Sequence, residues 1–438
     1  MSRTVSARRL VFAAGMCFFA AAPAQAQLIP TKPFRGIFRT TSDPAQSRTQ
    51  IDFLTFLAGG YEQTTVSAGG GVIRNTGDST FGYLMFRGRA AHQGRRFAFG
   101  ADGGATTVYH DAEVNRSPFS FSGTAHAEGS VGRRGTFAVR QTIYVSPYFG
   151  YSPIETNSNG SDEPVENTPD ASDPHIDERA TRLTTKGYST YASAAHQVGR
   201  TGLLFTSYNL GYTDYASSAP DVLFQSPRAG YRRRLWRFAS FVASYGIQST
   251  EYRDSGFSAL VSQDVALGVA YDRPLAAHRR TAFGFSTGTS FLREANGPGA
   301  YFNGTAHVTQ RIGRTWLTSL SYRRGQQVLA GFTVPFFTFA DSTSVYMSGR
   351  IFRELGLTAR GSYTHGRYTI GEFKNSFDTL AASARLQAPI FSVLGMYLEG
   401  YYTDYEFQQR LGLIRGAPAS LHRVGTRLGL TVLVPVLR

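Results

Sequence analysis

Eight charged residues lie in segments where apolar and polar residues alternate, and all eight share the phase of the small and polar positions. They are Asp102, Glu128, Arg140, Asp264, Arg360, Arg385, Glu399 and Arg427. If these segments are strands, the eight side chains project from one face of a sheet, because successive strand residues point to opposite faces. Such a face could select solutes by charge, with Arg360, Arg385 and Glu399 on three consecutive segments. Alternatively, the charges could pair with one another as a structural network.

The longest acidic stretch is the segment 151–185, which also contains four prolines. Its carboxylates include Asp162, Glu163, Glu166, Asp170, Asp173 and Asp177. A segment so poor in apolar residues is typical of a disordered surface loop. Carboxylates are also calcium ligands, but the spacing of Asp170, Asp173 and Asp177 does not match an EF-hand loop, and no central glycine accompanies them. We therefore expect no metal site.

The sequence gives little support to catalytic chemistry. Nine histidines are scattered along the chain, and no nucleophile elbow, HExxH motif or paired-aspartate signature appears. His126 shares the phase of Glu128, which indicates a polar wall residue rather than a general base. No helix is expected after Gly69–Gly71, so these glycines do not predict a phosphate cradle. We expect neither an enzyme nor a bound cofactor.

The elements that carry these residues are expected to be β-strands, because the alternation continues through most of the chain. In the segment 377–387, for example, Leu380 and Leu386 share one phase and Arg385 has the other. A period of two indicates a strand with two different faces. The alternating segments run about 10–16 residues, whereas soluble strands run ~5–6 and a tilted membrane strand needs ~9–11.

Residues 1–26 have the organisation of a Sec signal peptide. Arg3, Arg8 and Arg9 precede the apolar run 10–22, and Ala24-Gln25-Ala26 is a small-x-small cleavage motif. The apolar run is shorter than the ~20 residues of a membrane-spanning helix. Cys17 is the only cysteine. The mature chain expected after cleavage therefore has no disulfide and no thiolate.

Composition favours a membrane barrel over soluble domains or a helical membrane protein. The chain contains 47 Gly, 33 Phe and 24 Tyr, which suit closely packed strands and aromatic girdles. After the signal peptide no long apolar stretch remains, which argues against a bundle of membrane helices. The net charge is +15, but the arginines are spread along the chain without a nucleic-acid-binding motif, so nucleic acid is not an expected partner.

Two kinds of connection alternate between the expected strands. The short ones are rich in Arg or Gly: 91–95, 132–135, 199–202, 232–234, 273–280, 313–314, 352–354 and 389–392. The others are longer and more polar: 67–79, 111–118, 151–185, 215–221, 253–255, 295–299, 328–337, 371–375 and 408–421. This alternation predicts about eighteen strands, with sixteen as the alternative. An even number puts both termini and the short turns on the periplasmic side.

Tyrosines cluster just before several of the longer loops, which predicts an aromatic girdle at that membrane interface. The residues are Tyr208, Tyr212, Tyr215, Tyr245, Tyr252, Tyr397, Tyr401, Tyr402 and Tyr405.

We therefore expect an all-β fold: a single transmembrane, antiparallel, up-and-down barrel over 49–438, preceded by a periplasmic segment, 27–48. Lipid cannot satisfy an open strand edge, so the last segment, 422–436, must pair with the first, 49–61. The eight charges then face the lumen, because an arginine facing lipid at mid-depth would cost about 2–4 kcal/mol.

The end of the chain keeps its apolar residues in one phase: Leu428, Leu430, Val432, Val434 and Val436. It resembles the sorting and assembly signal of bacterial outer-membrane barrels, with Arg438 where a terminal Phe is usual and with Pro435 interrupting the pattern. The resemblance implies residence in the outer membrane of a Gram-negative bacterium. It also implies outer-membrane lipid, lipopolysaccharide and the assembly machinery as partners.

Over its mature length the chain also resembles porin-like barrels, including barrels associated with exopolysaccharide export, in its pattern rather than in any motif. The third loop of general porins folds into the lumen, and the resemblance implies the same for 151–185 as an alternative to a surface loop. We expect a channel for small hydrophilic solutes or saccharides. The alternatives are an export barrel working with periplasmic polysaccharide-export proteins, and a plugged structural or adhesive barrel.

Overall fold

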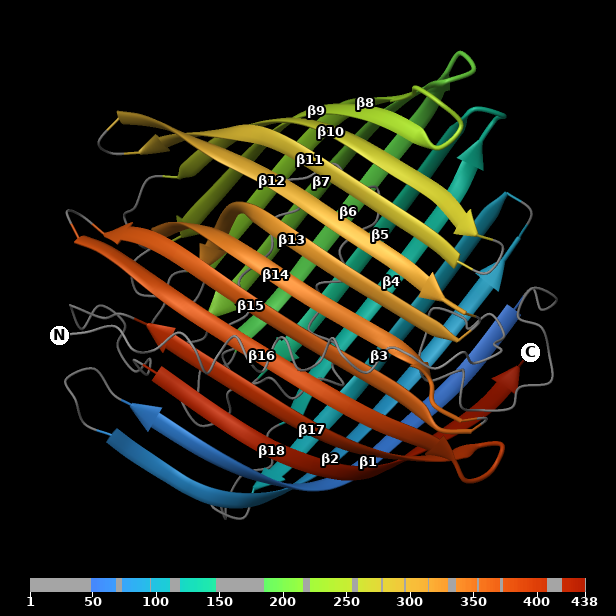
Figure 1. Cartoon of the computed structure of the whole chain (residues 1–438), viewed down its shortest axis with the longest axis vertical. Coiled ribbons are helices and arrows are strands. Elements are labelled where there is room, and N and C mark those ends of the chain that lie inside the picture. The colour runs from blue at the N-terminus through green and yellow to red at the C-terminus, as the bar shows by residue number, and fades with distance from the viewer. Residues whose placement is uncertain are drawn as a thin grey trace.

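The computed structural model is a closed barrel of eighteen antiparallel strands (Figure 1), which confirms the predicted fold class and strand number. The structure describes residues 49–67, 73–94, 96–110, 119–146, 185–215, 221–253, 259–276, 279–294, 297–313, 315–329, 336–352, 354–370, 373–407 and 420–437. Within these residues, no helix is long and apolar enough to cross a membrane.

The strands follow one another around the barrel in chain order. They are β1 (Thr49–Ser67), β2 (Ile73–Gln93), β3 (Phe97–His110), β4 (Phe119–Val131), β5 (Gly135–Ser146), β6 (Thr185–Val198), β7 (Gly202–Tyr215), β8 (Asp221–Arg234), β9 (Ala239–Arg253), β10 (Leu260–Ala276), β11 (Arg279–Glu294), β12 (Gly297–Ile312), β13 (Trp316–Leu329), β14 (Phe336–Arg350), β15 (Gly356–Ile370), β16 (Phe373–Pro389), β17 (Leu394–Phe407) and β18 (Ser420–Leu437).

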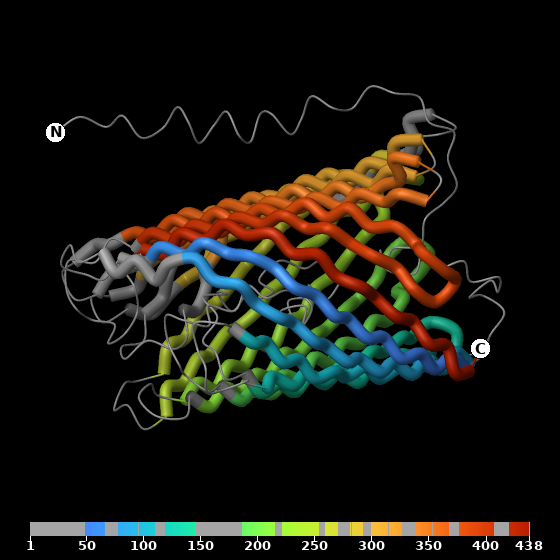
Figure 2. Tube along the Cα trace, turned by 90° about the horizontal axis from the view of Figure 1, so that it is seen from below, coloured from blue at the N-terminus to red at the C-terminus, as the bar shows by residue number. Residues whose placement is uncertain are grey.

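The barrel closes between its first and last strands. β1 pairs with β2 on one side and with β18 on the other, in a register that runs from Ile51 opposite Leu437 to Ser67 opposite Ser420. Figure 2 shows the blue β1 beside the red β18. This closure is the predicted one, and it leaves no open sheet edge that lipid would have to face.

Pro435 lies in β18 without opening the barrel, because the register changes where it occurs. Pro435 is opposite Asp52, and the pairing of β1 with β18 shifts between Ile51 and Asp52. Proline cannot donate a ladder hydrogen bond, so within a sheet it is found at such irregularities. Pro274 of β10 lies at a second register shift, where β10 pairs with β11.

The two faces of the wall differ as the alternation predicts. On the outer face, Leu57 and Leu428 are each 55% exposed. On the inner face, the neighbouring Phe56 and Arg427 are almost completely buried. An exposed apolar outer surface around a closed barrel is the surface that a bilayer covers.

The predicted girdle is correct for some tyrosines and wrong for others. Of the predicted tyrosines, Tyr208, Tyr212 and Tyr245 are on the outer face, and Tyr212 donates a hydrogen bond to Asp221 on the next strand. Tyr322 and Tyr363, which were not among the predicted residues, donate in the same way to Asp341 and Asp378. Tyr252, Tyr397 and Tyr401 instead are buried on the inner face. Position along the chain predicted that all of them lie near the longer loops, but only the phase of each residue decides which side of the wall it faces.

Several predicted connections are wrong in their bounds. Arg232–Arg234 belong to β8, and the turn to β9 is formed by 235–238. Only residues 295–296 separate β11 from β12, and only 371–372 separate β15 from β16. Strands up to β2's 21 residues are longer than the expected 10–16. Polar residues near the loops therefore belong to paired strand ends, because hairpin pairing continues beyond the point where the apolar pattern stops.

Six of the described short turns fall into two recurring types. In one, a glycine with positive φ is followed by an arginine, as at Gly132, Gly199 and Gly313, whose φ angles are 65°, 65° and 61°. Glycine adopts this left-handed conformation without the strain that a Cβ would cause. In the other type, two successive N–H groups donate to one carbonyl, and an aliphatic residue precedes an aromatic one. These turns contain Leu235–Trp236, Ile351–Phe352 and Ile390–Phe391.

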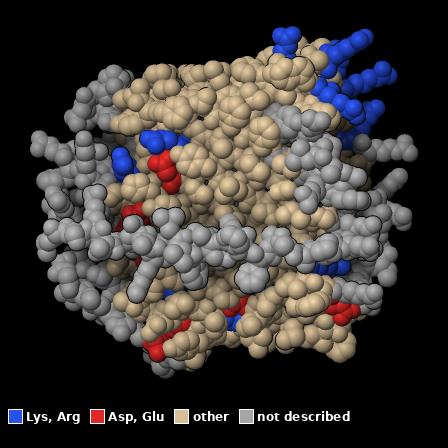
Figure 3. Space-filling view, viewed as in Figure 1, with Lys and Arg blue, Asp and Glu red and all other residues tan. Residues whose placement is uncertain are grey.

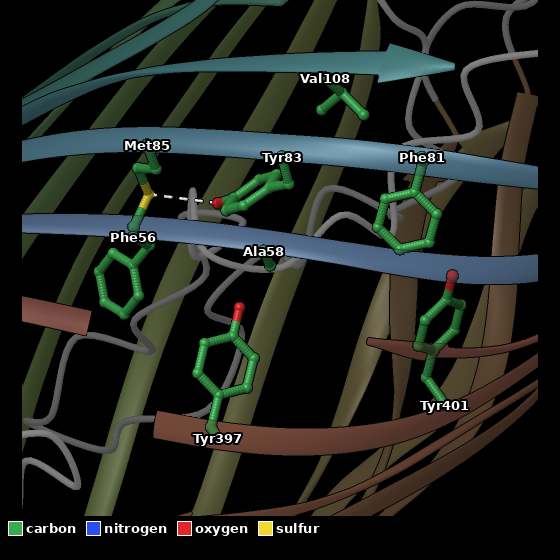
Figure 4. Packing of buried hydrophobic residues seen from close by; sticks show 8 residues of the cluster. All are labelled: Phe56, Ala58, Phe81, Tyr83, Met85, Val108, Tyr397 and Tyr401. Atoms are coloured by element: carbon green, nitrogen blue, oxygen red, sulfur yellow. Dashed lines mark hydrogen bonds between the residues drawn. The ribbon is translucent and has the colours of Figure 1, made fainter. Parts of the chain in front are cut away.

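Large rings pack along the inner wall near the closure. Phe56, Ala58, Phe81, Tyr83, Met85, Val108, Tyr397 and Tyr401 form a buried cluster (Figure 4). The wall accommodates these rings because the facing positions are glycines. A Cβ at Gly425 would collide with the Tyr401 ring, and one at Gly429 would lie 2.6 Å from the Tyr397 ring.

Gly425→Ala tests this packing. We expect it to lower the free energy of unfolding by about 1–3 kcal/mol, because the new methyl group must displace the Tyr401 ring. Gly400→Ala is the matched control, since a Cβ there meets nothing within 4 Å. Urea unfolding in detergent micelles measures both. Equal stability of the two variants would contradict the packing argument.

Candidate functional site

The inner wall of the barrel contains all eight charged residues singled out in the sequence. Each lies in the inner phase of its strand, as the pairing register shows: Asp102 on β3, Glu128 on β4, Arg140 on β5, Asp264 on β10, Arg360 on β15, Arg385 on β16, Glu399 on β17 and Arg427 on β18. Their role in lining a conducting pore stays a prediction.

Three of the eight form one ion-pair network. Arg385, Glu399 and Arg427 are directly opposite one another on β16, β17 and β18. Glu399 Oε2 accepts hydrogen bonds from Arg385 Nε at 2.8 Å and from Arg427 Nε at 2.9 Å. The Nη2 atoms of the two arginines lie 2.6 Å and 2.7 Å from the same oxygen. One carboxylate therefore holds two guanidinium groups.

Burial strengthens this network and makes it sensitive to change. The Glu399 and Arg427 side chains are each 2% exposed, and Arg385 is 9% exposed. Charges removed from water interact strongly, but a buried charge that loses its partner becomes costly. The network also leaves one positive charge in excess on this part of the wall.

A second ion pair adjoins the first across the closure. Arg423 Nε of β18 lies 3.7 Å from Glu62 Oε2 of β1, and the Tyr401 hydroxyl donates to the same oxygen at 3.0 Å. The Arg385 guanidinium lies 4.8 Å from the centre of the Tyr397 ring, within the range of a cation–π interaction. The closing strands thus share one continuous polar and aromatic network.

A different wall segment surrounds Asp264. Asp264 of β10 accepts hydrogen bonds from Ser290 and, at 3.5 Å, from Asn303 Nδ2. Arg228 of β8 and Arg323 of β13 are near enough to attract its carboxylate. These residues come from five strands, β8, β10, β11, β12 and β13.

The remaining charged candidates lie on β3 to β5 and on β15. Asp102 pairs with Arg87 of β2 at 2.6 Å, and Arg140 is directly opposite His126. Arg360 is opposite Ser383, one inner-face position from Arg385. The structure therefore brings Arg385 and Glu399 into contact and places Arg360 beside them, in an adjacent row.

The sequence reasoning missed several inner-wall residues that complete these networks. They are Asp52, Glu62, Arg87, Arg89, Arg228, Arg323 and Arg423. Their phase was a usable signal: Arg423 shares the phase of Arg427, four residues later on the same strand. Glu62 could be recognised as its partner only after β1 was placed beside β18.

Arginines outnumber carboxylates among the described inner-wall residues. The arginines away from the strand ends are Arg87, Arg89, Arg140, Arg228, Arg323, Arg360, Arg385, Arg423 and Arg427. The carboxylates whose side chains are described are Asp52, Glu62, Asp102, Glu128, Asp264 and Glu399. Among these described residues the inner wall therefore carries an excess of positive charge, and a surface of that sign favours anions.

The acidic candidates Asp162, Glu163, Glu166, Asp170, Asp173 and Asp177 lie outside the described residues, as does most of the segment 151–185. The expected signal peptide, 1–26, and the segment 27–48 also lie outside them. In the part of the chain that is described, no three His, Cys, Asp or Glu side chains gather in a way that could hold a metal ion.

The apolar outer surface, the closed strand ladder and the charged inner wall together decide the kind of protein. Only a closed barrel lets strands cross a bilayer with every backbone group paired, and single-chain barrels with an even number of strands are typical of the outer membrane of Gram-negative bacteria. The chain is an outer-membrane β-barrel of porin-like architecture.

No family model matches the chain, and no curated protein matches it. Solved structures similar to it include Pseudomonas aeruginosa OccK11 (OpdR), with 13% identity and a TM-score of 0.41, covering 89% of this chain and 96% of that chain. Acinetobacter baumannii OccAB2 has 11% identity and a TM-score of 0.44, covering 89% and 98%. Such low identities carry no information on substrate, so the function must be inferred from the chain's own inner wall.

Glu399→Gln tests the ion-pair network. The substitution leaves Arg385 and Arg427 buried side by side without a carboxylate, so we expect the free energy of unfolding to fall by about 3–5 kcal/mol. Glu128→Gln is the control, because Glu128 is an exposed inner-wall carboxylate, and we expect a change within about 0.5 kcal/mol. Urea titration in micelles measures both. A loss at Glu399 no larger than that at Glu128 would show that the network does not stabilise the barrel.

Proposed function

We propose that this barrel is an outer-membrane diffusion channel for small hydrophilic solutes, with a preference for anionic ones. The excess of arginine over carboxylate on the inner wall carries the proposal. A barrel of eighteen strands is wide enough to leave an aqueous channel. Cationic walls of low dielectric raise the local concentration of anions, so a solute with a carboxylate would enter more readily than its neutral analogue.

Hydroxyl groups on the wall support saccharides as a solute class. Six pairs of Ser or Thr hydroxyls hydrogen-bond between neighbouring strands on the inner face: Thr124–Thr142, Ser286–Thr305, Thr309–Ser319, Ser321–Ser344, Ser342–Thr364 and Ser348–Thr358. A hydroxyl both donates and accepts. These pairs can exchange partners with the hydroxyls of a passing sugar at little cost, so acidic saccharides would suit the wall in both charge and hydrogen bonding.

Ion selectivity in planar bilayers tests the proposed channel. Purified protein should conduct, and its reversal potential in a salt gradient should indicate anion preference. Arg360→Ser and Arg385→Ser should each shift that potential toward cation preference, because each removes a positive charge from the wall. The control is Arg324→Ser: Arg324 lies on β13 in the outer phase, opposite Asp341, so its loss should leave selectivity unchanged.

Liposome swelling tests the solute class with the same protein. Uptake should fall as sugars increase in size, and a uronic acid should enter faster than the neutral sugar of equal size. A barrel that neither conducts nor admits sugars would contradict the channel and favour the plugged alternative. Conductance with unchanged selectivity in both wall variants would retain the channel and refute the role of the arginines.

A further inference from the structure

Exposed arginines gather at the ends of four consecutive hairpins at one rim of the barrel, on the short turns and the strand residues next to them. These turns connect β2 to β3, β4 to β5, β6 to β7 and β8 to β9. We call the group the arginine arc; it consists of Arg96, Arg133, Arg134, Arg200, Arg233, Arg234 and Arg237, all exposed. Figure 3 shows Lys and Arg side chains gathered at the upper right, at the end of the barrel where the C-terminus lies in Figure 1.

Nothing acidic accompanies the arginine arc. The sequence has no Asp or Glu in 92–97, 131–135, 198–202 or 231–239, and the seven guanidinium groups make no ion pair with other described residues. Gly132 and Gly199 have the same positive φ of 65°, so the same backbone turn presents Arg133 and Arg200. Self-repulsion within such a group disfavours it unless an anionic ligand is present.

Apolar side chains interleave with the arc, which indicates the kind of ligand. Trp236, on the turn between β8 and β9, is 74% exposed, and Val131, the last residue of β4, is 65% exposed. On the other short turns, Phe352 and Phe391 are 70% and 67% exposed. Exposed aromatic rings beside cations mark the level of lipid headgroups, where the ring enters the bilayer and the charge meets phosphate.

We propose that the arginine arc binds the phosphates of anionic phospholipids in the periplasmic leaflet of the outer membrane. The barrel's orientation supplies the leaflet, because short turns lie on the periplasmic side in such barrels. Arg233 is in the outer phase of β8, opposite Gly202 of β7, so its guanidinium is on the lipid side of the wall. The proposal does not depend on conduction through the barrel.

A soluble polyanion, such as an acidic polysaccharide, fits the arc less well. It would satisfy the charges but would leave Trp236 and Val131 in water. A phospholipid satisfies both, since its phosphate meets the arginines and its acyl chains cover the apolar side chains. The soluble polyanion therefore becomes an outcome of the test.

The chain contains a reporter at the arc, because it has only two tryptophans, Trp236 and Trp316. Trp316→Phe keeps a ring against Gly349, which Trp316 packs over, and leaves Trp236 as the single emitter. In vesicles, quenching of Trp236 by brominated phosphatidylglycerol, compared with brominated phosphatidylcholine, gives the relative affinity for the anionic lipid. We expect a preference of about fivefold, from the ~1 kcal/mol that an arginine gains near an anionic surface, and a decline with added salt.

In the Trp316→Phe protein, the triple variant Arg133→Gln, Arg200→Gln and Arg237→Gln should bind both lipids almost equally. The ratio of the affinity for phosphatidylglycerol to that for phosphatidylcholine should then be close to one. The matched control removes the same charge from the outer face at the opposite rim, by Arg253→Gln, Arg324→Gln and Arg367→Gln, and should keep the preference. All six side chains are exposed, so both variants should fold. Heat-modified gel mobility checks folding, and Arg237→Gln alone replaces the triple variant if the triple fails.

Three results would overturn the proposal. The first is an equal preference for both lipids in the parent protein, or a preference that the arc variant keeps. The second is selectivity for a soluble polyanion: polygalacturonate binding to phosphatidylcholine-embedded parent protein, lost in the arc variant, with no preference for phosphatidylglycerol. An equal loss in the arc and control variants would also overturn it, since that would show general surface charge and no site.

Discussion

The hydrogen bonds between β1 and β18 are the constraint on which the rest of the structure depends. In hydrocarbon, each unsatisfied backbone group costs several kcal/mol, so eighteen strands can stay in a membrane only if the first pairs with the last. Closure then fixes an inside and an outside. Every strand must present an apolar face to lipid, and every charge must lie on the other face or at a rim.

The inner wall uses that closure and the hairpin beside it. Glu62 meets Arg423 only because β1 lies beside β18, and Glu399 of β17 holds Arg427 of the same strand β18. The same two seams carry the buried rings of Tyr397 and Tyr401, which fit because Gly425 and Gly429 face them. Ion pairs and ring packing thus stabilise the barrel where β1 pairs with β18, the two strands that are farthest apart in the sequence. The excess of arginine gives that same wall its electrostatic character.

The two rims differ in chemistry. At the long-loop rim, outward tyrosines donate to aspartates of the next strand, so carboxylates are held at the membrane surface. At the other rim, Gly–Arg turns and aliphatic–aromatic turns recur, so cations and rings are held there. Each turn type sets the backbone of only a few residues. Because the same turn recurs at several hairpins, the same kinds of side chain are presented at several points around this rim.

The sequence by itself determined the fold class, the number of strands and the inner phase of the eight charged candidates. Each follows from a period of two, a local property that every strand carries. Only the tertiary structure decided which charges meet and that Arg232–Arg234 end a strand. Period two gives a residue's face, but its partners depend on register. Register is set by strands up to hundreds of residues apart, as with Glu62 and Tyr401, and by pairing that continues past the apolar pattern.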